Sequence, residues 1–159
     1  MLPITKSAFD LDPAFRERID TLLLMDVLEH LPDPAAFLAT CATAFPNAST
    51  VHVTVPARME IWSNYDEYFG HFVRYTRSTL REMVTSAGYD LVDSAYAFHG
   101  LYLVARVAKL LSGKRSTKLT APSLPMAHAV LGKLLEVEHR LLPKRLKGSS
   151  IFALLKRAR

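Results

Sequence analysis

The stretch LLLMDVLEHLPDP, residues 22–34, decides the fold class of this chain. An apolar run ends at the acid Asp26, and a second acid, Glu29, stands three residues later beside His30. A short, continuous apolar run predicts a strand over Asp20–Met25 that is buried on both faces, as in a parallel sheet flanked by helices. The polar residues that follow it would then lie at the rim of the sheet.

The rest of the chain alternates helices and strands. Asp33 offers an N-cap oxygen and Pro34 fits the first helical position, so a helix is predicted over 35–45. The remaining elements are a strand over 50–55, a helix capped by Thr76 and ended by Gly88, a strand over 89–98, helices around 100–112 and 125–142, and a strand over 149–158. This order indicates an α/β fold with a parallel sheet and one antiparallel closing strand.

Length and composition fit one domain. The chain has 159 residues, of which 50% are hydrophobic, and its single cysteine, Cys41, lies in a helical apolar pattern that predicts core packing. No run reaches the roughly 18–20 apolar residues of a membrane span. The first ten residues lack the basic and then apolar pattern of a signal peptide. We therefore expect a cytoplasmic location, either free or peripheral at a membrane.

The charge is unevenly distributed along the chain. Residues 1–105 carry 7 basic and 13 acidic side chains, a net charge of −6, whereas residues 106–159 carry 13 basic and 2 acidic side chains, a net charge of +11. The basic third predicts contact with an anionic surface, either a membrane or a nucleic acid. A solvated basic face would give the same pattern.

Three segments resemble class I S-adenosylmethionine-dependent methyltransferases: LLLMDVLEHLPDP (22–34), GHFVRYTRSTLREMVTSAGY (70–89) and GSSIFALLKRA (148–158). The resemblance covers roughly residues 18–100 and 148–157, and it is strongest to the bacterial small-molecule branch that includes the quinone-biosynthesis methyltransferases. It implies a Rossmann-like sheet of seven strands, of which this chain supplies the last four, with a helical insertion over 98–147. It also implies S-adenosylmethionine as cofactor and a small-molecule or lipid-linked methyl acceptor.

The glycine-rich turn that ends the first strand of that family has no counterpart here, because no glycine precedes Gly70. We therefore expect residues 1–159 to form a single, incomplete domain that does not bind the cofactor well alone. A bare apolar strand edge would need cover from an N-terminal half, the first 18 residues or a second chain. The alternative functions are a non-catalytic remnant or partner subunit and, less favoured, a fragment of an RNA methyltransferase.

Candidate site residues follow the first predicted strand, because open parallel sheets bind ligands at the carboxyl ends of their strands. Asp26 and Val27 are predicted to lie on the cofactor side. Glu29, His30 and His71 are predicted catalytic groups, with His71 as general base because imidazole titrates near neutral pH. In the structural alternative, Asp26 caps the turn and His30 makes a buried hydrogen bond.

An aromatic segment over 57–75 is predicted to be a loop that closes over the acceptor. The residues expected to bind the acceptor are Trp62, Tyr65, Arg74 and Tyr75. In the alternative interpretation this segment packs as a small core of its own, and Arg74 pairs with Asp66 or Glu67.

A metal site is a further hypothesis. Small-RNA 2′-O-methyltransferases use a similar acid-x-x-Glu-His arrangement and a later histidine to hold a divalent metal. The resemblance implies Asp26, Glu29, His30 and His71 as ligands, with the metal polarising the acceptor hydroxyl. The first acid is the shorter aspartate, and the sequence does not identify the metal.

The two helices within 98–147 allow two interpretations. Apolar helical surface beside the bases Arg106, Lys109, Lys114, Arg115 and Lys118 is typical of a helix that lies on anionic lipid. Alternatively, the helices pack their apolar faces together as a cap over the acceptor site.

Overall fold

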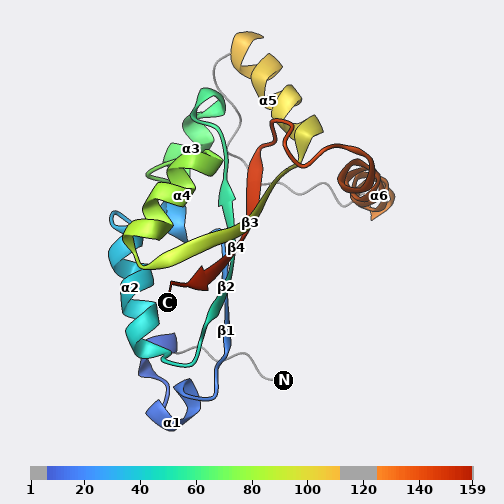
Figure 1. Ribbon diagram of the computed structural model, residues 1–159. Helices are drawn as coiled ribbons and strands as arrows, with labels where there is room; N and C mark the ends of the chain where they lie inside the picture. Colours follow the sequence, from blue (N-terminus) through green and yellow to red (C-terminus); the bar gives the residue numbers. More distant parts are fainter. Residues whose placement is uncertain (1–6, 112–124, 159) are drawn as a thin grey trace.

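The computed structural model describes residues 7–111 and 125–158, and a four-stranded mixed sheet lies at its centre (Figure 1). The strands are β1 (Thr21–Met25), β2 (Thr50–Pro56), β3 (Tyr89–Ala97) and β4 (Ser150–Arg157). They are arranged in the order β1-β2-β4-β3; β1 and β2 are parallel, and β4 runs antiparallel to both of its neighbours. The predicted α/β fold with an antiparallel closing strand is confirmed.

Two helices cover one face of the sheet and enclose the core (Figure 1). They are α2 (Pro34–Ala44) and α4 (Arg77–Ser86). Asp33 and Thr76 cap them as expected, because each side chain accepts a hydrogen bond from a backbone N–H in the first turn. Gly88 follows the C-cap of α4 and has φ of +81°, a conformation that glycine adopts without strain. Cys41 is buried in α2, as predicted.

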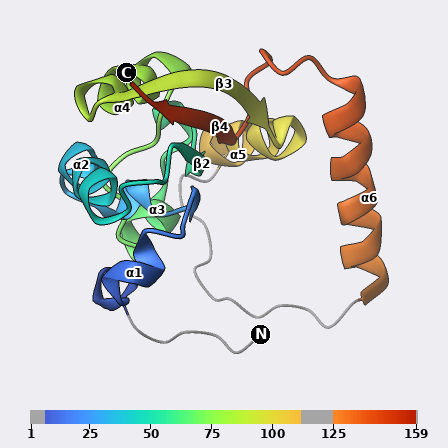
Figure 2. The ribbon, with the colours of Figure 1, turned by 60° about the horizontal axis from the view of Figure 1, so that its bottom comes forward.

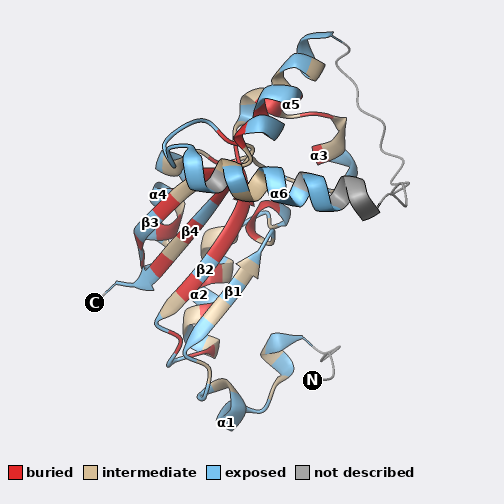
Figure 3. Cartoon of the chain, turned by 90° about the vertical axis from the view of Figure 1, so that its right-hand side faces the viewer, coloured by how far each residue is buried: buried red, intermediate tan, exposed pale blue. Residues whose placement is uncertain are grey.

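The first strand departs from the prediction of burial on both faces. β1 lies at the edge of the sheet, and its residues alternate between exposed and half-buried, with Leu23 66% exposed. Leu22 and Leu24 pack against the core, whereas Leu23 and Met25 are exposed. Figure 3 shows β1 at the edge of the sheet, coloured as exposed and half-buried. The prediction was wrong because, within the described ranges, no strand pairs with the outer edge of β1 and no helix covers its second face.

Residues near the N-terminus do not cover that edge either. They form two short helices, η1 (Ala8–Asp10) and α1 (Pro13–Arg16). The ring of Phe9 packs on Phe37 and Phe45 beside α2, with centroid distances of 5.9 and 6.2 Å. The described part of the first 18 residues therefore packs at the base of α2.

The aromatic segment over 57–75 is more ordered than the predicted loop. It contains η3 (Met59–Ile61) and α3 (Asn64–Tyr68). Ser63 and Asp66 form a reciprocal capping box at the start of α3, which a reading of aromatic spacing alone does not reveal. The segment ends where Ala57 and Tyr75 form an isolated bridge, so both of its ends are fixed to the sheet.

The two later helices lie between β3 and β4 in the chain. They are α5 (His99–Leu111) and α6 (Pro125–Leu141), and they project in different directions (Figure 2). Their contact within the described residues is local: the Glu138 carboxylate accepts hydrogen bonds from the N–H groups of His99 and Gly100, at 2.7 and 2.9 Å. Among the described residues, no helix is long and apolar enough to cross a membrane.

Candidate functional site

An open pocket of about 500 Å³ lies at the carboxyl ends of β1 and β2. Polar groups from the β1–α2 connection and the segment after α3 line one side, and apolar residues of α5 line the other. The lining residues are Asp26, Glu29, His30, Pro56, Ile61, Tyr65, His71, Arg74, Leu101, Val104, Ala105, Ala108, Ser149 and Ser150. The pocket occupies the position that the sheet topology predicts for a ligand.

Asp26 is held at the end of β1 by its neighbour on β2. Its N–H donates to the Thr54 hydroxyl and carbonyl, both at 3.0 Å, and the Thr54 hydroxyl in turn donates to the Asp26 carboxylate at 3.1 Å. Asp26 has φ of +52°, a left-handed conformation that aspartate tolerates better than most residues. This sharp turn directs the chain into η2 (Leu28–His30), which begins at the pocket rim.

Glu29 is the buried acid of the pocket. Its side chain is 1% exposed, and its Oε2 atom has no hydrogen-bond partner among the described residues. Burial raises the pKa of Glu29 to about 7, and the nearby Asp26 carboxylate acts in the same direction; the backbone hydrogen bond, His30 and Arg74 oppose the rise. A carboxyl group of this kind can accept and release a proton near neutral pH.

His71 is oriented by a buried carboxylate. Its Nδ1 lies 2.9 Å from Oδ1 of Asp66, which is itself 0% exposed, and Arg74 donates to the same oxygen at 2.6 Å. Burial alone would raise the pKa of Asp66, but the hydrogen bonds from Arg74 and Ser63 and the Arg74 charge outweigh it, so the pKa is lowered. An ionised Asp66 favours the His71 tautomer that is protonated on Nδ1, which leaves Nε2 for a substrate.

A backbone hydrogen bond joins the two segments that contain the candidate residues. The N–H of Phe72 donates to the carbonyl of Glu29 at 2.7 Å, and the N–H of His71 donates to the carbonyl of Asp66 at 2.9 Å. The rings of His30 and His71 meet edge to face with centroids 4.7 Å apart. The structure therefore gathers Glu29, His30 and His71, which lie 41 or more residues apart across the two segments.

The other predicted site residues are distributed differently. Asp26, Tyr65 and Arg74 line the pocket, whereas Val27, Trp62 and Tyr75 are not among its lining residues. Tyr75 is 3% exposed and its hydroxyl donates to the carbonyl of Leu28 at 3.5 Å, which makes it part of the core. Arg74 pairs with Asp66, as the alternative interpretation of the aromatic segment expected.

Three of the four predicted metal ligands lie together. One donor atom from each of Glu29, His30 and His71 lies within 4.8 Å of the others, and Asp26 is not part of this group. One carboxylate and two imidazoles are donors that divalent transition metals accept, and a carboxylate behind a ligating imidazole, as Asp66 stands behind His71, is a common arrangement. The residues fit a metal, and metal binding stays a prediction.

Sequence reasoning missed two parts of the pocket. Asp66 was considered only as a salt-bridge partner of Arg74, although its place in a Ser-x-x-Asp capping box five residues before His71 was a usable signal. The α5 residues that line the pocket were not singled out, although one interpretation of residues 98–147 placed their helices over the acceptor site. Tyr102 and Arg106 fix α5 to η3 through Glu60, at 3.2 and 3.3 Å.

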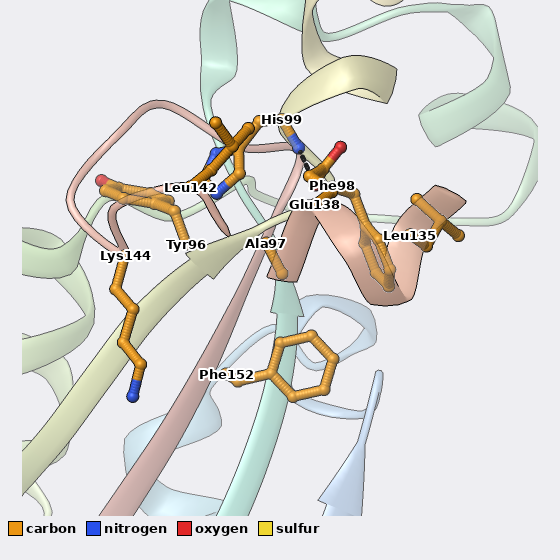
Figure 4. Close-up of a pocket in the computed structure, with 9 residues that line it drawn as sticks. All are labelled: Tyr96, Ala97, Phe98, His99, Leu135, Glu138, Leu142, Lys144 and Phe152. Atoms are coloured by element: carbon orange, nitrogen blue, oxygen red, sulfur yellow. Dashed lines mark hydrogen bonds between the residues drawn. The ribbon is translucent and has the colours of Figure 1, made fainter. Parts of the chain in front are cut away.

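A second cavity, of about 280 Å³, lies apart from this pocket between α6 and the ends of β3 and β4 (Figure 4). Its lining is mostly apolar, with Phe98, Leu135 and Phe152 around it and Lys144 at one side. The one acid in its lining, Glu138, already binds the backbone at the start of α5. The groups that can carry chemistry are in the first pocket.

Comparison with known proteins gives matches among solved structures. No protein-family model matches the sequence, and none of the curated proteins matches it. A chain in the complex between the Haloferax volcanii Trm112 methyltransferase activator and the proposed methyltransferase superposes with a TM-score of 0.51 and 13% identity, over 90% of this chain and 56% of that chain. This match shows the fold: the chain resembles part of a methyltransferase fold.

Two further matches have lower scores. A proposed sarcosine dimethylglycine methyltransferase from Galdieria sulphuraria gives a TM-score of 0.49 at 16% identity, over 89% of this chain and 54% of that chain. An S-adenosylmethionine-dependent methyltransferase from Archaeoglobus fulgidus gives a TM-score of 0.46 at 15% identity, over 89% of this chain and 60% of that chain. The chain thus spans 54–60% of the length of these three structures.

The described residues fit one side of an S-adenosylmethionine site. Asp26 offers a carboxylate at the end of β1, and the pocket beside it opens at the correct end of the sheet. A glycine-rich turn that would let the backbone approach the cofactor is absent from the sequence before Gly70. β1 forms one edge of the sheet, and among the described residues no strand pairs with its outer side.

Proposed function

We propose that this chain carries the acceptor side of an S-adenosylmethionine-dependent methyltransferase site, and that the acceptor is a small molecule or a lipid-linked molecule. The observation that carries the proposal is the Asp66–His71 pair, which stands beside a buried Glu29 in a pocket at the carboxyl ends of parallel strands. The methyltransferase fold of the chain supports it.

The cofactor supplies an electrophilic methyl group on a sulfonium centre. The pocket residues position an acceptor hydroxyl or amine against that methyl group, and positioning provides much of the rate. In this proposal His71 would take the acceptor's proton on Nε2 when the methyl group is transferred. Asp66 stabilises the imidazolium that results, since its carboxylate already binds Nδ1.

The apolar wall of α5 favours an acceptor with an apolar part. Leu101, Val104, Ala105 and Ala108 face the polar side of the pocket that contains Glu29. An acceptor with a polar head and an apolar tail would satisfy both sides. Arg74 contributes little free charge for an anionic acceptor, because its guanidinium is already bound to Asp66.

The cofactor side is supplied, in this proposal, by polypeptide that pairs with the free edge of β1. A second candidate function, a non-catalytic partner subunit of a methyltransferase, rests on the same open edge. The two differ in the need for His71: a partner subunit would stimulate methyl transfer equally well without its imidazole.

The experiment begins with the coding sequence upstream of Met1, which is read in frame and, where it continues, expressed together with this chain. Transfer of a labelled methyl group to a lipid extract and to an aqueous extract is then measured. We expect His71→Ala to lower the rate of methyl transfer by about 10²-fold to 10⁴-fold. The matched control is His52→Ala, an exposed histidine on β2 outside the pocket. Equal transfer by both variants would exclude His71 as the base.

A further inference from the structure

The exposed face of α5 is apolar, which is the reverse of an ordinary surface helix. Leu103, Val104, Val107, Leu110 and Leu111 recur at helical spacing, and each is between 53% and 81% exposed. Helices on globular proteins normally turn such a face toward the core. In α5 the buried side is formed by other residues, Tyr102 and Ala105.

The contacts of α5 explain why this face stays outward. Tyr102 donates to the Glu60 carboxylate and Arg106 donates to the Glu60 carbonyl, so the polar side of the helix is fixed to η3. The helix projects away from the sheet and from α6 (Figures 1 and 2). Within the described ranges, the apolar face therefore has no partner element.

We propose that this outward face of α5 docks on an anionic lipid surface. α5 contains no acidic residue, and its charged residues are Arg106 and the exposed Lys109. The α6–β4 connection adds the exposed bases Lys144, Arg145 and Lys147. An apolar face accompanied by bases and no acids is the composition of helices that lie in the interface of anionic membranes.

A polypeptide occupant is less consistent with the topology. The matched methyltransferase structures are longer than this chain, and their additional strands would pair with the free edge of β1. α5 follows β3, which forms the opposite edge of the sheet. α5 is fixed to η3 beyond the carboxyl ends of the strands, and it does not pair with the free edge of β1.

The helix also connects the proposed lipid surface to the pocket. Leu101, Val104, Ala105 and Ala108 line the pocket, and Val104 is at the same time 65% exposed on the outer face. A lipid-linked acceptor could therefore move along α5 from the bilayer to Glu29 without leaving an apolar surface. This route rests on the proposed function, whereas docking on lipid does not.

The test is co-sedimentation of the purified chain with vesicles, which requires no methyl transfer and so fails independently of the proposed function. Vesicles of phosphatidylcholine alone are compared with vesicles that also contain phosphatidylglycerol. We expect binding to the anionic vesicles at low salt and release at high salt, because the charge attraction is screened.

Variants locate the binding surface. Leu110→Asp combined with Leu111→Asp should weaken binding at least about tenfold, because both side chains lose apolar burial in the membrane. Its control is Val92→Asp, an exposed apolar residue on β3. Lys109→Glu should weaken binding, with Arg81→Glu, an exposed base on α4, as control. Lys114, Arg115 and Lys118 lie outside the described residues and are left unchanged.

Several results would overturn the proposal. The first is a chain that stays in the supernatant with anionic vesicles at low salt, or one whose binding is unaffected by the α5 variants. The second is a concentration-dependent dimer, detected by light scattering, that Leu110→Asp with Leu111→Asp dissolves; the occupant would then be a second copy. Binding to both kinds of vesicle without salt dependence would contradict the role of the bases.

Discussion

The buried acid Glu29 should make the stability of this protein depend on pH in a specific direction. Its pKa is about 7 in the folded chain, against 4.5 for an ordinary glutamate. The folded state therefore holds the proton more tightly than the unfolded state does. Stability from this group is fully present below pH 4.5, falls as the pH rises toward 7, and levels off above it.

The magnitude follows from proton linkage. Between about pH 5.5 and about pH 8.5, a carboxyl group with these two pKa values loses about 2 kcal/mol of folding free energy. Glu29→Gln carries no proton to titrate and should lack this loss. The glutamine still fills the site, in which the Glu29 side chain is 1% exposed and Oε2 has no partner.

The assay is urea denaturation of both proteins at the two pH values, with a chelator present so that no metal competes for the carboxylate. The free energy of unfolding of the wild type minus that of Glu29→Gln should fall by about 2 kcal/mol from the lower to the higher pH. Glu82→Gln, which changes an exposed glutamate on α4, is the control for the substitution itself. Parallel pH profiles for wild type and Glu29→Gln would refute the reasoning.

Three further predictions concern stability and reactivity. Asp66→Asn should destabilise the fold by about 3 kcal/mol in urea, because it leaves a buried arginine without its counter-ion; an unchanged midpoint would contradict this. Gly148→Ala should cost about 1–3 kcal/mol, since its Cβ would meet the Ala97 backbone, whereas Gly132→Ala, in open space on α6, should cost nothing. Burial raises the pKa of Cys41 to about 11, so a thiol reagent should label it slowly before unfolding and fast in urea; rapid labelling of the folded chain would disprove its burial.

Much of the fold could be predicted because local signals agree with the tertiary structure. Asp33 and Thr76 each stand before an apolar helical pattern, and both cap the expected helices. Gly88 marks a helix end that needs a left-handed residue. On α6, Glu136 and Arg140 stand at i, i+4 spacing and form an ion pair at 2.6 Å. Such signals depend only on neighbours in sequence.

The errors arose where burial depends on distant chain. An apolar run such as that of β1 fits a central strand and an edge strand equally well. Its composition therefore could not reveal that Leu23 is exposed at the edge of the sheet. The direction of α5 could not be predicted either, because the sequence holds no signal for the hydrogen bonds from Tyr102 and Arg106 to Glu60 that fix it.

The candidate site was predicted in its residue types and less well in its geometry. Glu29, His30 and His71 were selected for their chemistry and their place after a strand, and the structure gathers them. The role of Asp66 depends on its contacts with Ser63, His71 and Arg74, and only the first of these is signalled locally, by the capping box. Tyr75 illustrates the converse, since an aromatic residue in that segment can equally serve the core.

The central claim, that this chain holds the acceptor side of the site and lacks the cofactor side, is tested most directly by calorimetry with S-adenosylmethionine on the purified chain. The account predicts no saturable heat at micromolar cofactor, because no glycine-rich turn precedes Gly70 to admit it. Stoichiometric binding with a micromolar dissociation constant would contradict the account.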